Sequence, residues 1–316
     1  MRRKLGLVAV VVALFSLGLA TLLAFYVPDR VKKTPLDLDV TLYGTGSGLY
    51  FNAATNTAAP VKVRTIRHVK SDTSASDGNT LVVNQGLCIV RDTGGTPTCS
   101  RGDQLINVTT ERIAANRVTA LAQKGYRSPA DNSIVSQLDG ADVEHVGLTL
   151  KFPFDAQKKT YPFWDYNLKT SQDARYTGED KIDGQKVYVY QTSTPKTAYE
   201  VLPGVKGFYT DNRTLFVEPE TGSIIKSEDQ QLKQFANGSI AAKLSLETSP
   251  ESVKSQLKTA RDGIDKLHGV TTTYPIIFLI IGIVVGIGAV VLLIGARDPD
   301  ERTPANRYES DPVRVG

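Results

Sequence analysis

One short stretch of the 316-residue chain gathers several of the residue types from which a ligand site can be built. The segment KFPFDAQKKTYPFWDYNL, residues 151–168, holds the only tryptophan of the sequence among phenylalanines, tyrosines and a lysine pair. Aromatic rings bury large apolar areas, and tyrosine and tryptophan also keep one polar group that needs a partner. The segment is therefore suited to a packed corner of the core, to the wall of a lipid site or to the rim of an active site.

We favour the lipid site among these three. Lipid sites are concave and mainly apolar, with a few polar groups that fix the head, and basic side chains beside aromatic rings suit a phosphate-bearing head. The phenylalanines and the tryptophan are expected to contact the acyl chain, and the tyrosine and the lysines the head group. The predicted ligand-binding residues are Phe152, Phe154, Lys158, Lys159, Tyr161, Phe163 and Trp164.

Catalytic chemistry has little support in the sequence. The three histidines, His68, His145 and His268, lie in separate segments, and no motif of a zinc protease, serine hydrolase or nucleotide-binding enzyme is present. No nucleophile lies beside a candidate base. The glycines of YGTGSGLYFN, at positions 44, 46 and 48, are expected to form a turn or bulge rather than a phosphate loop, because strand-like residues follow them. We therefore predict no enzymatic activity, no metal and no cofactor.

Two long apolar segments indicate a membrane protein. Residues 5–27 follow a basic start and residues 275–296 form a second run, and each is long enough to cross a hydrocarbon core of about 30 Å. The first run exceeds the apolar region of a secretory signal, which favours an uncleaved anchor, although Gly18-Leu19-Ala20 would also serve as a cleavage site. The basic start places the N-terminus in the cytoplasm. Localisation at the plasma membrane follows, with residues 28–274 extracytoplasmic.

The two cysteines, Cys88 and Cys99, flank the turn-like sequence RDTGGTP. A hairpin that turns near Thr93 and Gly94 would place them at facing positions on neighbouring strands, and an extracytoplasmic location favours a disulfide. Two buried thiols are the alternative.

Most of the outer segment shows the two-residue period of β-strands. KVYVYQTST, from Lys186, alternates aliphatic and aromatic residues, and TLFVEPETGSIIKSED, from Thr214, has the pattern of a hairpin. Residues 110–124 are compatible with a helix or a strand, and the context favours a strand. Many short strands predict a mainly β fold, an antiparallel elongated barrel or sandwich.

One amphipathic helix follows these strands. Ser249 and Pro250 form a helix start signal, and apolar residues then recur at spacings of three and four along one stripe. The stripe is expected to dock on the sheet; a lid or a strut on the membrane surface is the alternative. The predicted domains are an N-terminal start and anchor (1–27), a β domain (28–248), an amphipathic helix and linker (249–274), a transmembrane helix (275–296) and a cytoplasmic tail (297–316).

Three segments carry a resemblance to a known family. HVGLTLKFPFDAQKKTYPFWD (145–165), TGEDKIDGQKVYVYQ (177–191) and LFVEPETGSII (215–225) resemble the actinobacterial envelope proteins labelled porin-A-like. The resemblance covers nearly the whole chain. It implies an extracytoplasmic, elongated β-barrel-like body with internal cavities and one or two membrane anchors, and a link of some relatives to maturation of cell-envelope lipoglycans.

Lipid or glycolipid binding in support of envelope assembly is the function that we predict. A non-catalytic scaffold for an envelope glycosyltransferase or transporter is the main alternative. An outer-membrane porin is less favoured, since the strands are short and broken by Gly and Asp, unlike the apolar strands of roughly 9–11 residues in membrane barrels. The expected partners are a membrane lipid or glycolipid and the plasma membrane, and a formal net charge of only +4 argues against nucleic acid.

Overall fold

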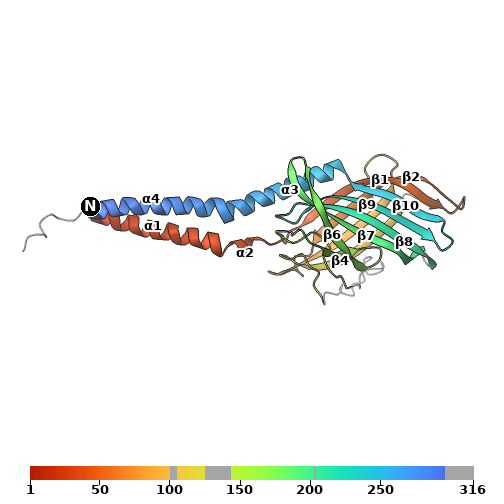
Figure 1. Cartoon of the computed structure of the whole chain (residues 1–316), viewed down its shortest axis with the longest axis horizontal. Helices are drawn as coiled ribbons and strands as arrows, with labels where there is room; N and C mark the ends of the chain where they lie inside the picture. The colour runs from red at the N-terminus through yellow and green to blue at the C-terminus, as the bar shows by residue number, and fades with distance from the viewer. Residues whose placement is uncertain (100–104, 125–143, 203, 296–316) are drawn as a thin grey trace, which may run out of the picture. The chain divides into compact units, whose positions relative to one another are not determined.

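The computed structural model describes residues 1–99, 105–124, 144–202 and 204–295. The chain divides into two compact units. One is helical and contains Met1–Val31 and residues 267–295; the other, Lys32–Lys266, contains the sheet (Figure 1).

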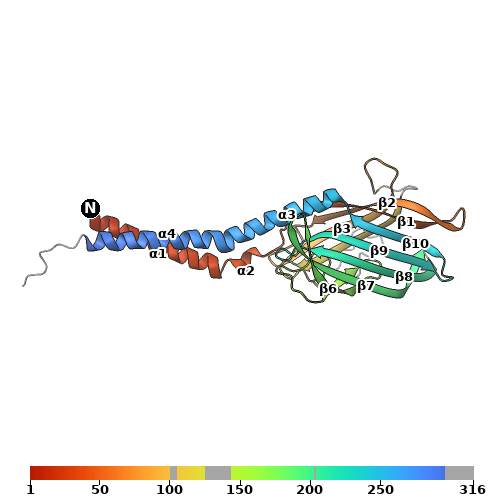
Figure 2. The same ribbon diagram turned by 45° about the horizontal axis from the view of Figure 1, so that its top comes forward.

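Ten antiparallel strands form a single curled sheet, a half-barrel, in the second unit (Figures 1 and 2). The order across the sheet is β4-β3-β2-β1-β10-β9-β8-β7-β6-β5. It consists of two runs of sequential neighbours, β1 to β4 and β5 to β10, which join where β1 pairs with β10. The mainly β antiparallel fold predicted from the sequence is confirmed, as one curled sheet rather than a sandwich. The strands are β1 Asp39–Asn52, β2 Thr57–Ser71, β3 Thr80–Arg91, β4 Leu105–Asn116, β5 Tyr161–Asp165, β6 Thr170–Ile182, β7 Gln185–Leu202, β8 Val205–Val217, β9 Ile224–Phe235 and β10 Ile240–Thr248.

The concave face of the sheet is identified by contacts between residues of distant strands. Trp164 on β5 hydrogen-bonds to Glu111 on β4, at the opposite edge of the sheet. Arg67 on β2 donates to Tyr166, which directly follows β5. Such contacts are possible only inside the curl. Successive side chains point to opposite faces of a strand, so Glu111, Arg67 and the pairing register assign the residues of β1 to β4 and of β7 to β10 to the concave or the convex face.

The two edges of the sheet are bridged at one end. Leu121, just beyond β4, forms an antiparallel bridge with Leu148, and Leu148 forms a parallel bridge with Phe163 of β5. The backbone N–H of Leu148 donates to Pro162 over 2.8 Å, and that of Trp164 donates to Leu148 over 2.8 Å. These bonds satisfy edge groups that would otherwise offer a template for another chain. Residues 110–124 are therefore strand as far as Asn116, followed by a turn and this bridge, and not a helix.

The glycines expected in a turn or bulge lie instead inside β1, so that prediction is wrong. A Cβ added to Gly44 would lie 2.7 Å from the carbonyl oxygen of Glu247 on β10. At Gly46 it would lie 2.6 Å from Leu246 Cδ2 and 3.1 Å from Val63 Cγ2. Glycine in a strand commonly marks such a close approach. Here it lets side chains of β2 and β10 meet above β1, a contact that we call the glycine seam.

A helix, α3 (Pro250–His268), packs on the convex face of the sheet. Its residues Leu257 and Ala260 are buried against Val187 of β7 and Ile225 of β9. The hydroxyl of Ser249 accepts from the N–H of Ser252 over 3.3 Å, which caps the first turn as the sequence predicted. The apolar stripe thus docks on the sheet, as expected.

The predicted disulfide between Cys88 and Cys99 is present, with the two Cα atoms 6.0 Å apart. Its predicted geometry, however, is wrong. Cys88 lies on β3 opposite Val108 of β4, whereas Cys99 lies in the connection between these strands. The connection is longer than the tight hairpin that the cysteine spacing suggested. The disulfide therefore ties a loop back to a strand instead of joining two strands.

The helical unit consists of α1 (Arg2–Phe25), α2 (Pro28–Val31), a π-helical turn (Gly269–Thr273) and α4 (Tyr274–Ile294). By length and composition α1 and α4 are able to cross a membrane. A Cβ on Gly282 of α4 would lie 2.8 Å from Leu17 of α1, and one on Gly286 would lie 3.6 Å from Ala13. Small residues thus allow the two helices to pack closely. The predicted cytoplasmic tail, 297–316, lies outside the described residues.

Candidate functional site

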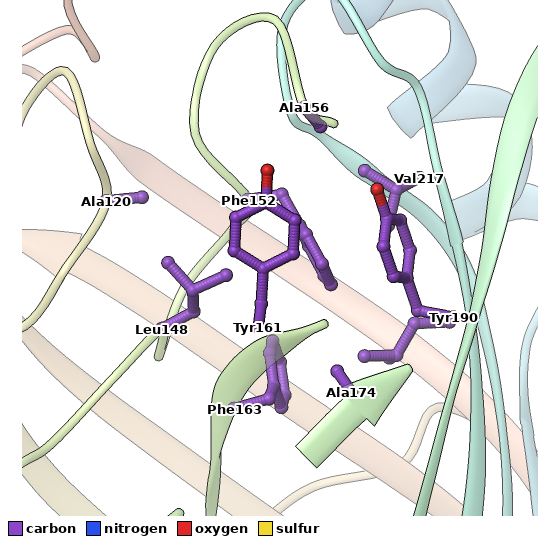
Figure 3. Close-up of a cluster of buried hydrophobic side chains, with 10 residues drawn as sticks. Ala120, Leu148, Phe152, Ala156, Tyr161, Phe163, Ala174, Tyr190 and Val217 are labelled. Carbon is purple, nitrogen blue, oxygen red and sulfur yellow. The ribbon is translucent and has the colours of Figure 1, made fainter. Parts of the chain in front are cut away.

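The aromatic stretch predicted to bind lipid contributes to a packed cluster in one part of the concave face (Figure 3). The ring of Phe152 lies 4.4 Å from that of Tyr190 and 5.4 Å from that of Tyr161, centroid to centroid. Phe163 joins the same cluster from β5. Phe152 and Tyr190 have no exposed surface. The structure therefore brings three of the predicted residues together as part of a core, and their role in ligand binding stays a prediction.

Trp164 points away from this cluster. Only 1% of its surface is exposed. Its indole Nε1 donates to Glu111 Oε1 over 3.1 Å, and its ring centroid lies 4.6 Å from that of His145. Nε2 of His145 lies 3.4 Å from Glu111 Oε2, but neither atom has a hydrogen-bond partner within the described part of the chain. Trp164 thus helps to join the two edge strands.

The remaining predicted residues lie nearer the surface. Lys158 forms a 2.6 Å ion pair with Glu179, and its side chain is half exposed. Lys159 Nζ lies 5.2 Å from the Tyr161 ring centroid. Phe154 stacks on Lys151 Nζ at 3.7 Å, and burial lowers the pKa of Lys151 to about 7. Lys158 and Lys159 therefore lie beside rings that belong to the aromatic cluster or pack on it, whereas Trp164 lies apart from it, and the predicted binding role of these residues stays a prediction.

Sequence reasoning missed a cluster of charged residues on the concave face of β8 and β9. Nη2 of Arg213 on β8 lies 3.0 Å from Asp229 Oδ2 and 3.4 Å from Asp211 Oδ2. Asp211 and Arg213 are almost completely buried. We call Asp211, Arg213, Asp229 and Lys233 the charged cluster.

The two carboxylates of the charged cluster have different protonation behaviour. Burial raises the pKa of Asp211 well above its usual range, and a hydrogen bond with Asp229 adds to this effect. Burial acts in the same direction on Asp229, but the charge of Arg213 outweighs it and leaves the pKa of Asp229 below its usual value. Asp229 is therefore the ionised partner of Arg213, and Asp211 the protonated one.

Lys233 extends the charged cluster along β9. Its Nζ donates to Asn167 Oδ1 over 2.9 Å and to the hydroxyl of Tyr199 over 3.3 Å, and lies 4.9 Å from the Tyr199 ring centroid. Burial lowers the pKa of Lys233 to about 8, although nearby carboxylates oppose this shift. Lys233 is only partly covered by protein, so a half-buried cation lies on the concave face.

The strand beside β9 is β10, which carries apolar side chains on the concave face. The residue pairs between β9 and β10 are Asp229 with Leu246, Gln231 with Leu244, and Lys233 with Ala242. Leu244 and Leu246 belong to an apolar cluster with Val61 and Val63 of β2 across the glycine seam. A boundary between charged and apolar side chains thus runs along the concave face between β9 and β10.

One sequence signal would have revealed the charged cluster. In TDNRTLFV, from Thr210, charged residues occupy alternate positions that continue into Leu215 and Val217. Charged residues at the same alternate positions of a strand as buried apolar residues point to the buried face, and such residues are rarely exposed to solvent. Within the described residues no group of three or more His, Cys, Asp or Glu is able to hold a metal ion.

Comparison with known proteins identifies the family of the chain and confirms the resemblance seen in its sequence. The family described as Porin PorA matches residues 5–291. A Porin PorA of Corynebacterium amycolatum is 27% identical over 219 residues, which cover 54% of this chain and 53% of the relative, so the chain spans about half the length of that relative. A LolA superfamily protein of Nitrosomonas europaea is 10% identical, and the match covers 72% of this chain and 91% of that protein. The TM-score of 0.12 is too low to indicate a shared fold. The chain belongs to the Porin PorA family.

Proposed function

We propose that this protein is a membrane-anchored extracytoplasmic protein that binds a lipid or glycolipid on the concave face of its half-barrel and supports assembly of the cell envelope, including its lipoglycans. The observation that carries the proposal is the boundary between β9 and β10, where Lys233 and Asp229 lie beside Ala242 and Leu246. An amphiphile needs both kinds of surface within one site.

The acyl chain would lie on the apolar side, over Leu244 and Val63, where burial of methylene groups contributes about 0.8 kcal/mol each. The head group would lie on the charged side, against Lys233. A lysine whose pKa is lowered to about 8 is held in a partly desolvated position, where an anionic group restores favourable electrostatics. The role proposed for the chain is therefore one of binding.

Anchoring is the second part of the proposal. The helices α1 and α4 would cross the plasma membrane, so that the sheet unit and α3 are extracytoplasmic. The disulfide on the sheet unit is consistent with an oxidising compartment.

The name porin suggests transport through a barrel, but the surface of this sheet favours a different environment. The convex face of β6 to β9 carries polar residues such as Arg175, Gln191, Asn212 and Glu228. A membrane barrel needs an apolar band on its outer face. The polar convex face therefore supports a water-exposed sheet.

A scaffold for an envelope glycosyltransferase or transporter is the second candidate. The complete burial of Phe152 and Tyr190 favours it, because a filled core offers no space to a ligand at the place predicted from the sequence. The two candidates differ in whether the sheet unit retains lipid.

Titration with a phospholipid that carries a fluorescent acyl chain tests the proposal on the full chain in nanodiscs. Lys233→Met should weaken binding of the anionic probe about tenfold, as expected for loss of one charge-assisted contact. Lys243→Met is the matched control: Lys243 follows Ala242, the residue paired with Lys233, and its side chain is exposed on the convex face. Equal affinity of all three proteins, or no binding at all, would exclude this site and leave the scaffold.

The aromatic stretch has its own test with the same probe. If Lys158 and Lys159 bind the head group, the double change to Gln should lower the affinity and flatten its salt dependence. If the charged cluster binds the head, that variant should retain wild-type affinity while Lys233→Met loses it.

Membrane topology is tested with reporter fusions. A reporter that is active only outside the cytoplasm should be active when inserted near Thr96, in the connection between β3 and β4, and inactive when fused at Gly316. Activity at Gly316 would contradict the two crossings.

A further inference from the structure

The convex face carries a second candidate site, separate from the concave face. A cleft of about 810 Å³ is formed by residues of the strands β6, β7, β8 and β9. Its size falls within the range of small-ligand sites, roughly 300–1,000 Å³. Every residue that lines the cleft is polar or charged. They are Ser171, Gln172, Asp173, Arg175, Thr177, Gln191, Thr192, Ser193, Asn212, Arg213, Thr214, Glu228 and Gln230.

The pairing register arranges the outward side chains of the cleft in two adjacent rows. The first row runs across four strands, because Arg175 pairs with Gln191, Gln191 with Thr214, and Thr214 with Glu228. In the second row Ser193 pairs with Asn212, and Asn212 with Gln230. Side chains at paired positions lie about 4.5–5.5 Å apart at Cβ. The rows therefore form a continuous lattice of hydrogen-bonding groups.

Several of these groups have no hydrogen-bond partner of their own. Ser193 donates to Asn212 over 2.8 Å, and Ser171 donates to the carbonyl of Val146. Across the described ranges, by contrast, the side-chain amides of Gln172, Gln191 and Gln230 make no hydrogen bond to the protein. Each amide offers two donors and an acceptor with two lone pairs. The cleft thus presents both donors and acceptors that are available to a ligand.

The charges of the cleft are mixed rather than of one sign. Asp173 and Arg175 lie 3.8 Å apart, and Glu228 is paired with Lys226 over 2.7 Å. Paired charges give no net attraction to an anion or a cation, and the absence of apolar side chains from the lining offers nothing to an acyl chain. A neutral ligand rich in hydroxyl groups is the chemical class that matches such a surface.

We propose that this cleft binds a neutral oligosaccharide, through hydrogen bonds from the amides of Gln191, Asn212 and Gln230 to sugar hydroxyls. The site is distinct from the proposed lipid site, since Gln191, Asn212 and Gln230 point to the opposite face of the sheet from Lys233. A chain with both sites would hold lipid and glycan on opposite faces of one sheet.

Saturation-transfer NMR tests the proposal, with the full chain in a detergent that has no sugar head group. The probes are trisaccharides of glucose, mannose and galactose at millimolar concentration. At least one should receive saturation from the wild-type protein, and the double variant Gln191→Leu and Gln230→Leu should bind it about tenfold more weakly, since two or more hydrogen bonds are lost. Thr214→Val, which is nearly isosteric, is an independent second variant and should weaken binding less.

Gln234→Leu is the matched control, because Gln234 lies on the same face of β9 as Gln230 but outside the cleft. Its binding should equal that of the wild type, and circular dichroism should show that all variants retain the fold. The proposal would be overturned if no trisaccharide received saturation from the protein, or if the wild type and the double variant bound the sugar equally well. Binding that falls steeply with added salt would also overturn it, because a neutral sugar is insensitive to screening.

Discussion

The indole of Trp164 on β5 and the carboxylate of Glu111 on β4 are hydrogen-bonded over 3.1 Å, although their strands form opposite edges of a ten-stranded sheet. Both side chains are almost fully buried. The bond therefore helps to hold the curl of the sheet, in addition to the backbone bridges through Leu148.

Trp164→Phe should destabilise the protein by about 1–3 kcal/mol, because a buried carboxylate oxygen loses its donor. Glu111→Gln keeps an acceptor at the same place and should cost less than about 1 kcal/mol. Denaturant unfolding followed by circular dichroism measures both, since Trp164 is the only tryptophan and its fluorescence is lost in the first variant. Equal stability of the Phe variant and the wild type would show that the bond contributes nothing.

The disulfide gives a second prediction. Cys88 and Cys99 are 11 positions apart, and loop-closure entropy for a loop of that size corresponds to a stabilisation of roughly 3 kcal/mol. Cys99→Ser should therefore lower the free energy of unfolding by roughly that amount; Cys99 is the suitable position because it is exposed and Cys88 is buried. Under reducing conditions wild type and variant should have the same stability. A difference that persists after reduction would mean that the serine itself, and not the lost disulfide, has the effect.

The charged cluster predicts unequal effects of two similar substitutions. Asp229→Asn removes the ionised partner of Arg213 and should cost about 3–5 kcal/mol, as for a buried ion pair that loses one member. Asp211→Asn replaces a protonated carboxyl by a neutral group of the same shape and should change stability at neutral pH by less than about 1 kcal/mol. Unfolding by denaturant compares the two variants, and equal costs would refute the assignment of protonation states.

The same assignment fixes a pH dependence. Because the pKa of Asp211 is raised in the folded state, folded protein binds a proton that unfolded protein releases above about pH 4. The stability from this group is complete below that pH and is lost as the pH rises toward the folded-state pKa. Unfolding measured across this range should show a decline in the wild type that Asp211→Asn reduces. An identical pH profile for the two proteins would contradict the raised pKa.

The glycine seam supplies the fifth prediction. Replacing glycine by alanine in a strand ordinarily stabilises it by roughly 0.5–1 kcal/mol, and this is expected for Gly86 on β3, where a Cβ meets no atom within 4 Å. At Gly48 the new Cβ would collide with the backbone carbonyl of Lys243 on β10. Gly48→Ala should therefore lower the melting temperature while Gly86→Ala keeps or raises it. Equal thermal unfolding curves for the two variants would disprove the close approach.

Much of the secondary structure was predictable because its signals are local. The alternation in KVYVYQTST, from Lys186, lies within β7, and the apolar stripe that includes Leu257 and Ala260 belongs to α3. The two long apolar helices follow from length and composition in the same way. These patterns need no knowledge of which strand lies beside which.

Features that depend on distant partners were not predictable. Gly46 has the local signature of a turn, and only Leu246 of β10, about 200 residues later, gives it a place inside a strand. The aromatic stretch around Phe152 was predicted as a ligand site, but Tyr190 and Leu215 of other strands complete it as a packed cluster. Similarly, Asp229 and Lys233 resemble a solvated face until the curl of the sheet places them on its concave side.

The join between β1 and β10 has a consequence for the order of folding. Within each of the two runs of sequential strands, hairpins close over short connections, whereas the pairing of Gly44 with Thr248 must close a loop of about 200 residues at a higher entropic cost. Each run is therefore expected to form early and on its own, and docking of β1 onto β10 to be the slow step. Until β10 has been synthesised, β1 is an unprotected edge whose glycines leave it without bulky side chains to shield its backbone. A newly made chain is thus most vulnerable to pairing with another copy during the interval between synthesis of its first and its last strand.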